Sequence, residues 1–457
     1  MTEASGTQLI LALVIGISAL IFMILKTKIH TFLALIISAV MIGLIAGMVP
    51  TAVTAAVQAG FGGTLGGIGI IIGFGVMMGT IFEASGAAER MARTFLKLFG
   101  KGREEAALAV TGFFVSIPVF CDSAFVILSS LAKSLSRKTK KSIFTLAGAL
   151  SLGLLATHIM VPPTPGPLGV AGIFGVDVGQ MIIFGFIVAI PMMIASIFYF
   201  KWLGTKLYQI PSEDGETWIR GPYQPPVYDL SADDSDKHLP SAFLSFLPLL
   251  LPVFLILTNT ILNMQGLNQG IFLVFIFLGT PVIAVGIGLL LCIYVLAFKS
   301  ERKVVMENME KGIRASGIIL LVTGGGGALG AVLTQSGVGA FIAHGIAGTP
   351  IPIIFLPFVV STLIRFVQGS GTVAMITSAS ITAPIVLAAG GNMLMGALAA
   401  ACGAIFFSHF NDSYFWVVNR LCGVTDAKEQ IRMSSISSTV AWGAGLVTII
   451  ILNIIIG

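Results

Sequence analysis

Charged side chains are scarce in this sequence. They make up 10% of its 457 residues, whereas 56% of the residues are hydrophobic. A soluble domain carries about a quarter charged residues over its whole composition, so this scarcity excludes an ordinary soluble protein. Long apolar blocks are present instead, many of them able to cross a hydrocarbon core of about 30 Å. The composition therefore predicts an all-α polytopic membrane protein.

Cysteine and histidine are also few. The sequence has four cysteines and five histidines, with no CxxC and no HExxH motif. These absences argue against a disulfide framework and against the common zinc sites. We therefore expect the cysteines to be packing residues, and we expect no cofactor and no metal. A membrane enzyme stays open as an alternative, because His409 and Asp412 could ligate a metal, although no second close cluster completes such a site.

The sequence repeats itself at an offset of 251 residues. Small residues of one half recur in the other, and His158 recurs as His409. The matched small residues are Gly73, Gly75, Gly79, Ser85, Gly86 and Ala92 in the first half, and Gly324, Gly326, Gly330, Ser336, Gly337 and Ala343 in the second. Repeated halves are typical of transporters, whose substrate site lies at the repeat interface near the membrane midplane. The glycines themselves favour close helix packing, with direct substrate contact as the alternative.

The positions of lysine and arginine predict the membrane topology. Basic residues cluster at 26–28, 90–103, 133–141, 201–206, 299–303 and 420–432. No signal-peptide cleavage site is evident, and residues 7–26 run too long for a typical h-region, so we interpret them as a retained first span. If the basic clusters are cytoplasmic, both chain ends lie outside. The net charge of +5 then follows from topology and does not indicate nucleic-acid binding.

The segment 106–132 is apolar but has basic residues at both ends. It must therefore enter and leave on the cytoplasmic side, which predicts a re-entrant hairpin with its turn near Pro118 and Ser123. Such irregular backbone is tolerated at membrane depth only where it lines a cavity or is buried in protein.

The corresponding segment of the second half, 352–386, has uncharged flanks. We expect a second hairpin there that enters from the external side, with its turn at 368–372, where glycines permit close backbone approach to a ligand. The two repeats are then inverted. The predicted organisation is repeat 1 at 1–205, a polar cytoplasmic linker at 206–240, and repeat 2 at 241–457.

Arg365 is the one basic residue inside an apolar block away from a cytoplasmic edge. A charge at the bilayer centre costs at least about 2.5–3.5 kcal/mol, so it is a functional candidate by default. Its planar guanidinium suits a substrate carboxylate, which it can hold through two parallel hydrogen bonds. The alternatives are that it reaches the external headgroups or pairs with Asp122 as a structural link.

A transporter that couples substrate movement to protons needs a side chain that takes up and releases a proton. Asp122, at the first predicted turn, is the preferred carrier, because removal from water favours the neutral form of a carboxyl. His158, His409 and Asp412 are the reserves. Each has a structural alternative, since a buried polar residue is most often permanently hydrogen-bonded.

Four ordered motifs resemble those of the gluconate:proton symporter (gluconate permease) family. They are IPVFCDS at 117–123, VPPTPGP at 161–167, QGSGTVA at 368–374 preceded by Arg365, and SHFNDS at 408–413 followed by Phe415 and Trp416. The resemblance implies a secondary active transporter that imports gluconate or a related sugar or hydroxy acid with protons. Through the wider ion transporter superfamily, it also implies a homodimer of scaffold domains beside mobile transport domains, an elevator-type arrangement in the inner membrane.

The resemblance and the two hairpins together predict the binding residues. The substrate-binding set is Arg365, Ser123, Gly369, Ser370, Gly371, Thr372, Thr164, Asn411 and Ser413, with Arg365 on the carboxylate and the hydroxyl and amide side chains on substrate hydroxyl or amino groups. The chain departs from the family pattern at Cys121, Thr164, Phe366, Gly371 and Tyr414. These departures support a carboxylate transporter better than gluconate itself, and D-serine or another small amino acid is the alternative substrate. A cation/proton antiporter using Asp122 and Asp412 is the alternative of another class.

Overall fold

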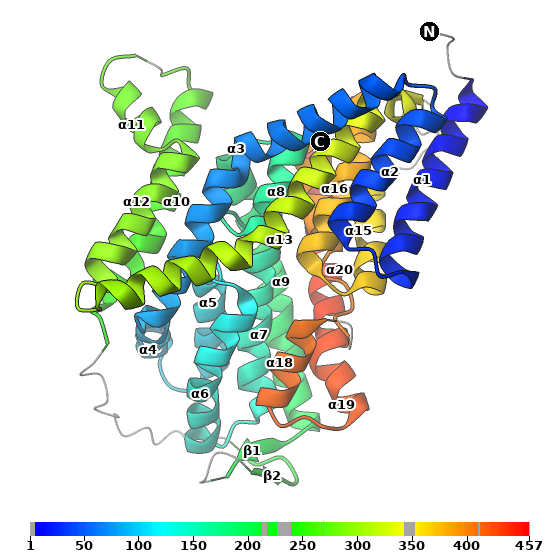
Figure 1. The fold of residues 1–457 in the computed structure, drawn as a ribbon. Coiled ribbons are helices and arrows are strands. Elements are labelled where there is room, and N and C mark those ends of the chain that lie inside the picture. The colour runs from blue at the N-terminus through cyan, green and yellow to red at the C-terminus, as the bar shows by residue number, and fades with distance from the viewer. Residues whose placement is uncertain are drawn as a thin grey trace.

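The chain folds almost entirely into helices (Figure 1). The computed structural model describes residues 5–212, 217–225, 239–267, 269–341, 352–409 and 412–456. The first half contains α1 (Gly6–Lys26), α2 (Thr31–Ile45), α3 (Pro50–Ala84), α4 (Ala87–Phe99), α5 (Glu104–Val115), α6 (Cys121–Thr139), α7 (Ile143–Met160), α8 (Pro165–Phe174) and α9 (Val178–Lys206).

The second half is also helical and includes two π-helical turns, named η. It contains α10 (Ala242–Met264), α11 (Phe272–Leu278), α12 (Pro281–Leu291), η2 (Cys292–Leu296), α13 (Arg302–Gln335), α15 (Phe355–Gln368), α16 (Gly371–Ala388), α17 (Met393–Gly403), α18 (Ser413–Leu421), α19 (Ala427–Gln430), η3 (Ile431–Ile436) and α20 (Ser437–Ile456).

Eight helices among the described residues are long and apolar enough to cross a membrane, or nine if the bent pair Phe272–Leu278 and Pro281–Leu296 forms one span. A helix satisfies its backbone hydrogen bonds internally, which suits a membrane because hydrocarbon offers no hydrogen-bonding partners. The all-α membrane architecture predicted from composition is therefore confirmed. The predicted first span corresponds to α1, and it is followed by the shorter α2, of 15 residues.

The two predicted hairpin turns lie between helices. The first separates α5 from α6, and Ser116 closes it by donating from Oγ to the carbonyl of Val119 at 3.1 Å. The second separates α15 from α16, where Gly369 has a φ of +88° that favours glycine. Ser370 then caps α16, its Oγ accepting from the amide of Val373.

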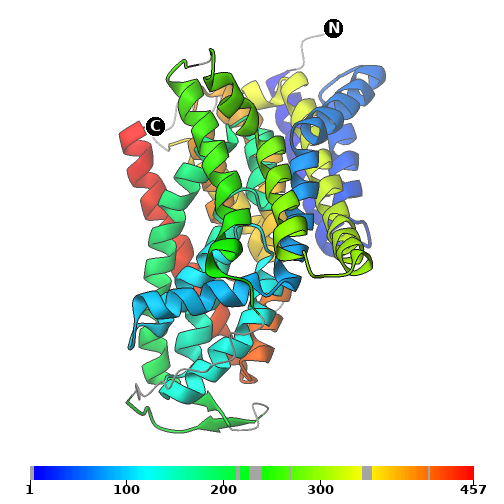
Figure 2. The same ribbon diagram turned by 90° about the vertical axis from the view of Figure 1, so that its left-hand side faces the viewer.

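Two further elements are broken helices. The run 161–164 separates α7 from α8, and α17 ends at Gly403, well before α18 begins at Ser413. Prolines cause the first break because they remove backbone donors, and Thr164 satisfies the freed carbonyls of His158 and Val161 by donating to them at 3.0 and 2.6 Å. Both chain ends lie toward one end of the molecule and the β-strands at the other, in two perpendicular views (Figures 1 and 2).

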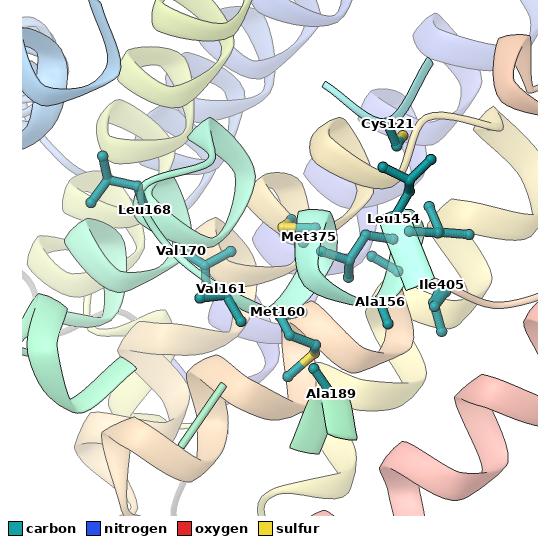
Figure 3. Packing of buried hydrophobic residues seen from close by; sticks show 14 of the residues in the cluster. Cys121, Leu154, Ala156, Met160, Val161, Leu168, Val170, Ala189, Met375 and Ile405 are labelled. Carbon is teal, nitrogen blue, oxygen red and sulfur yellow. The ribbon is translucent and has the colours of Figure 1, made fainter. Parts of the chain in front are cut away.

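The first broken helix lies at the centre of the fold. Every residue from Ile143 to Ala171 is buried, which suits this largely apolar segment, since it has no polar face to present. Figure 3 shows Met160, Val161, Leu168 and Val170 packed among side chains of other elements, including Met375 of α16. All four cysteines are free and buried, in agreement with the packing role predicted for them.

Two of the repeat-matched glycines allow close approach between elements. A Cβ atom on Gly79 of α3 would lie 2.4 Å from the carbonyl oxygen of Pro118 in the first turn. One on Gly326 of α13 would lie 2.2 Å from Oγ of Ser380 in α16. No real side chain tolerates such distances, so these glycines let each long helix pack against a hairpin, which favours the packing interpretation over substrate contact.

The predicted linker contains a small sheet that the sequence analysis missed. Strands β1 (Gln209–Pro211) and β2 (Trp218–Arg220) pair antiparallel, with Gln209 opposite Arg220. The Gln209 amide donates to the carbonyl of Cys422 at 2.7 Å, which ties the sheet to the loop after α18. Strands of three residues are too short to show the alternation that identifies a strand in sequence.

Candidate functional site

One polar cavity brings together most of the predicted site residues. Its volume is about 460 Å³, within the range of about 300–1,000 Å³ typical of small-molecule sites. The polar side chains that line it are Asp122, His158, Arg365, Gln368, Ser370, Thr372, Asp412, Ser413 and Tyr414, and the backbone of Gly369 and Gly371 lines it as well.

Three helices point their N-termini at this cavity. The first residues of α6, α16 and α18 line it, namely Cys121, Gly371 and Ser413, and these helices are 19, 18 and 9 residues long. The amides of a first helical turn have no partner within the helix, and the aligned peptide dipoles place about half a positive charge there. The cavity is therefore suited to an anion.

Arg365 adds a whole positive charge to the partial charges of the helix N-termini. Its side chain is only 2% exposed, on α15 just before the second turn. Nη1 donates to the carbonyl of Gly369 and Nη2 donates to Asp412 Oδ2 at 2.5 Å, while the buried Nε has no protein partner. The structural link considered for Arg365 thus exists, but with Asp412 and not with Asp122.

Asp412 accepts hydrogen bonds from several donors. Besides Arg365, Oγ of Ser408 donates to its Oδ2 at 2.5 Å, and the amide of Tyr414 donates to its Oδ1 at 3.0 Å, which caps α18. Ser408 is itself fixed, because its amide donates to Oγ of Ser438 at 2.9 Å. These contacts fix the position of the Asp412 side chain against Arg365.

Asp122 is less well supported. Its Oδ1 accepts from Ser413 Oγ at 3.4 Å and its Oδ2 lies 3.8 Å from Cys121 Sγ, both long contacts for hydrogen bonds. Among the described residues no lysine, arginine or histidine forms an ion pair with it. Among the described residues, Asp122 is therefore held by fewer and longer contacts than Asp412.

The two repeat-matched histidines differ in their surroundings. His158 lines the cavity beside the ring of Phe120, with ring centroids 5.6 Å apart, and its buried Nδ1 has no protein partner. His409 does not line the described cavity. Its Nε2 lies 2.8 Å from the carbonyl of Phe366, so this nitrogen carries the proton in that contact. Only His158 is placed to meet a ligand.

Two described residues of the predicted binding set do not line the cavity. Thr164 is 2% exposed and its hydroxyl is used within the break of α7–α8. Ser123 lies in the first turn of α6, next to Asp122 but away from the lining. Asn411 lies outside the described residues.

The sequence analysis missed part of the lining. Ile318, Ile319 and Val322 of α13 form an apolar wall, and nothing in a long apolar helix distinguishes them from residues that face lipid. Tyr414 was noted only as a departure from the family pattern. Its hydroxyl donates to the carbonyl of Ser151 at 2.9 Å, so the ring is fixed at the cavity edge.

Sequence comparisons agree on one family, and a solved structure shares the fold. The sequence pattern of the family described as GntP family permease matches residues 8–455. An uncharacterized permease of Haemophilus influenzae is 46% identical, covering 98% of this chain and 93% of its own. A gluconate permease of Pseudomonas aeruginosa is 32% identical, covering 98% of both chains. The structure of Neisseria gonorrhoeae MtrF, from a class of antimetabolite efflux pumps, has a similar fold, with a TM-score of 0.67, 13% identity and coverage of 96% of this chain and 97% of its own.

Proposed function

The chain belongs to the GntP permease family, and from this premise we propose that it imports a small organic acid, gluconate or a related sugar acid, together with protons. It is a multi-pass inner-membrane permease and not an enzyme. The observation that carries the proposal is the meeting of Arg365 with the N-termini of α6, α16 and α18 in one cavity. A carboxylate is the ligand group that this arrangement favours most.

Arg365 holds the substrate carboxylate in this proposal. Its unpartnered Nε is one available donor, and Nη2 becomes a second donor when the substrate displaces Asp412. Ser370 and Thr372 then bind substrate hydroxyl groups from the N-terminus of α16, and Ser413 binds another from α18. Ser123, Thr164 and Asn411 stay predictions.

A count of charges supports proton coupling. Two carboxyl groups, Asp122 and Asp412, share the cavity with one guanidinium, that of Arg365. An incoming carboxylate adds a further negative charge to a site removed from bulk water, where an unpaired charge is costly. Protonation of Asp122 cancels the negative charge that the substrate adds. Substrate and proton would thus bind together, with Asp122 as the carrier and His158 as the nearest reserve.

The cavity walls support an elevator-type movement. All the polar lining comes from α6, α7, α15, α16 and α18, whereas α13 contributes only apolar residues to it. A substrate held by the first set of helices could therefore move past α13 without breaking hydrogen bonds to it. We assign α13 and its neighbour α3 to the scaffold. The inverted relation of the two halves belongs to the same proposal, and the homodimer stays a prediction.

A ligand screen tests the substrate class. Purified protein is heated with sugar acids, short hydroxy acids and D-amino acids, and the unfolding temperature is recorded. A ligand at 100 times its Kd stabilises the native state by about 2.7 kcal/mol, which such a screen resolves. Stabilisation by sugar or hydroxy acids supports the proposal. Stabilisation by D-amino acids alone would replace it with the amino acid alternative, in which the ammonium group pairs with Asp122.

Topology can be tested by cysteine labelling. We expect a cysteine at position 138 to be cytoplasmic and one at 392 to be external, because the flanks of the first hairpin are basic and those of the second uncharged. An impermeant maleimide added to intact cells should therefore label position 392 and not 138. The parent protein is the control, since its own cysteines are buried. Labelling at 138 but not at 392 would rule out the proposed orientation.

A further inference from the structure

Helix α4 joins α3 to the first hairpin, and one of its faces is covered by protein. Met91 is fully buried, and one turn later Phe95 stacks on Phe114 of α5, with ring centroids 5.5 Å apart. Phe95 also meets Phe246 of α10 edge-on, at the same centroid distance of 5.5 Å. The apolar face of α4 therefore packs between the first hairpin and α10, which leaves its polar face turned outward.

The same helix lies where three long helices reach one end of the membrane-spanning region. Nε of Arg90 donates to the carbonyl of Pro240, just before α10, at 2.7 Å. In the last turns of α3, the hydroxyl of Thr80 donates to the carbonyl of Asn308 in α13 at 2.9 Å. Figure 2 shows α4 lying across the long helices. In the proposed topology this end is cytoplasmic, so α4 lies at the level of the cytoplasmic headgroups.

The end of α4 and the loop after it present a basic surface. Its three exposed basic side chains are those of Lys97, Lys101 and Arg103. Leu98 lies among them and is 75% exposed. The acidic residues that follow do not offset this charge at the surface, because Glu104 and Glu105 are buried and both pair with Lys141, at 2.7 and 2.5 Å.

We propose that this basic surface binds anionic phospholipids of the cytoplasmic leaflet. The lysines and the arginine contact the headgroup phosphates, while Leu98 enters the boundary between headgroups and acyl chains. Basic residues beside an exposed apolar side chain are the combination by which a helix in the membrane plane binds such a leaflet. Each lysine or arginine near an anionic membrane surface favours association about fivefold.

The lipid contact bears on movement of the first hairpin, a step that rests on the proposed function. Gly102 belongs to the hairpin side, since its amide donates to Glu104 Oε1 at 2.8 Å and its carbonyl accepts from Lys141 Nζ at 3.0 Å. Gly100, with a φ of +74°, is the residue directly after α4, and a Cβ there would meet no atom within 4 Å. The hairpin therefore pivots at Gly100. Lipid that holds the end of α4 lets it do so without pulling Arg90 away from α10.

The test measures which lipids surround Leu98. A bimane fluorophore is attached to Leu98→Cys in the full-length protein, whose own cysteines are buried. The protein is placed in phosphatidylcholine vesicles that contain a small fraction of a lipid with a nitroxide near the top of one acyl chain. We expect nitroxide phosphatidylglycerol to quench roughly twofold or more better than nitroxide phosphatidylcholine, and the difference to shrink in high salt, which screens charge. Equal quenching by the two lipids would overturn the proposal.

A second labelled position controls for general lipid exposure. Leu273→Cys lies on α11 at a 53% exposed position, within residues 241–298, which contain no charged side chain. The two nitroxide lipids should quench a bimane there equally. A preference for phosphatidylglycerol at both positions would show general adsorption of anionic lipid, which contradicts a specific surface.

Matched charge variants identify the residues responsible. The first variant, built on Leu98→Cys, combines Lys97→Gln, Lys101→Gln and Arg103→Gln. The second makes the same change of charge at another exposed basic cluster, with Lys299→Gln, Arg302→Gln and Lys303→Gln. The first should lose the preference for phosphatidylglycerol at position 98, and the second should keep it. A preference that survives in the first variant, or disappears in both, contradicts the assignment.

An uptake assay separates the lipid surface from its effect on transport. The parent protein should take up substrate faster in vesicles that contain phosphatidylglycerol than in phosphatidylcholine alone, and the first charge variant should show no such difference. If quenching shows the preference while uptake by the parent is equally fast in both vesicles, the lipid surface stands and its effect on the hairpin is wrong. If no form transports any acid, the proposed function has failed, and the quenching result still decides the lipid surface.

Discussion

Replacing Arg365 with lysine is expected to weaken carboxylate binding roughly 10- to 150-fold, which corresponds to about 1.5–3 kcal/mol for a lost hydrogen bond to a charged group. Lysine keeps the positive charge but not the planar fork. One ammonium group cannot serve Gly369, Asp412 and a substrate together, whereas the guanidinium has a separate nitrogen for each. Equilibrium binding of the acid found in the ligand screen measures the effect.

We expect the Arg365→Lys protein to fold. The lysine still neutralises Asp412, which is 8% exposed and would otherwise be a buried unpaired charge. Breaking a buried ion pair by removing one partner costs about 3–5 kcal/mol, so Arg365→Ala would confuse loss of binding with loss of folding. Arg93→Lys is the matched control, because Arg93 pairs with Glu89 on α4 and lies far from the cavity lining. Equal affinity in Arg365→Lys and the parent would refute the assignment.

Most of the candidate site could be predicted because charged and irregular features are rare in an apolar chain. Arg365 and Asp122 were identified by the cost of placing charge in hydrocarbon, and the 368–372 turn by its glycines. Each of these lines the cavity. A membrane protein retains such costly residues mainly where they serve a function, so each can be identified by itself from its place in an apolar segment.

What the sequence could not predict depends on contacts between distant segments. The pairing of Arg365 with Asp412 joins residues 47 positions apart, whereas the sequence analysis had named Asp122 as the partner of Arg365. The repeat predicted equivalent roles for His158 and His409, but a repeat fixes only the backbone position. His158 lines the cavity, whereas His409 does not line it and contacts the carbonyl of Phe366 through Nε2. The apolar wall of α13 could not be predicted either, because it too depends on which distant segments come together.

Replacing Asp122 with asparagine is expected to abolish accumulation of substrate under a pH gradient. Asparagine has nearly the shape of aspartate but carries no titratable proton, so the loaded carrier can no longer release one. Substrate binding and counterflow exchange should remain measurable, because exchange needs movement of the loaded carrier and no net proton release. Uptake into vesicles with an imposed pH gradient, beside counterflow in its absence, separates these two activities.

The control for this variant is Asp177→Asn. Asp177 caps α9 and accepts from Thr260 at 2.9 Å, away from the cavity, and asparagine caps a helix about as well as aspartate. This variant should accumulate substrate normally. The proton number follows from the voltage dependence of the parent. One proton with a monovalent acid moves no net charge, whereas two protons move one charge, and 100 mV then contributes about 2.3 kcal/mol, or roughly 50-fold in accumulation.

An Asp122→Asn protein that still concentrates substrate would move the coupling role elsewhere, and Asp412→Asn would then decide where. In the proposed scheme Asp412 competes with the substrate carboxylate for Nη2 of Arg365. Asparagine at 412 keeps the helix cap but removes the competing charge, so substrate should bind more tightly while accumulation persists. Loss of accumulation in Asp412→Asn and its survival in Asp122→Asn would instead make Asp412 the carrier. Coupling would then proceed through release of Arg365, because a protonated Asp412 no longer holds the guanidinium by charge.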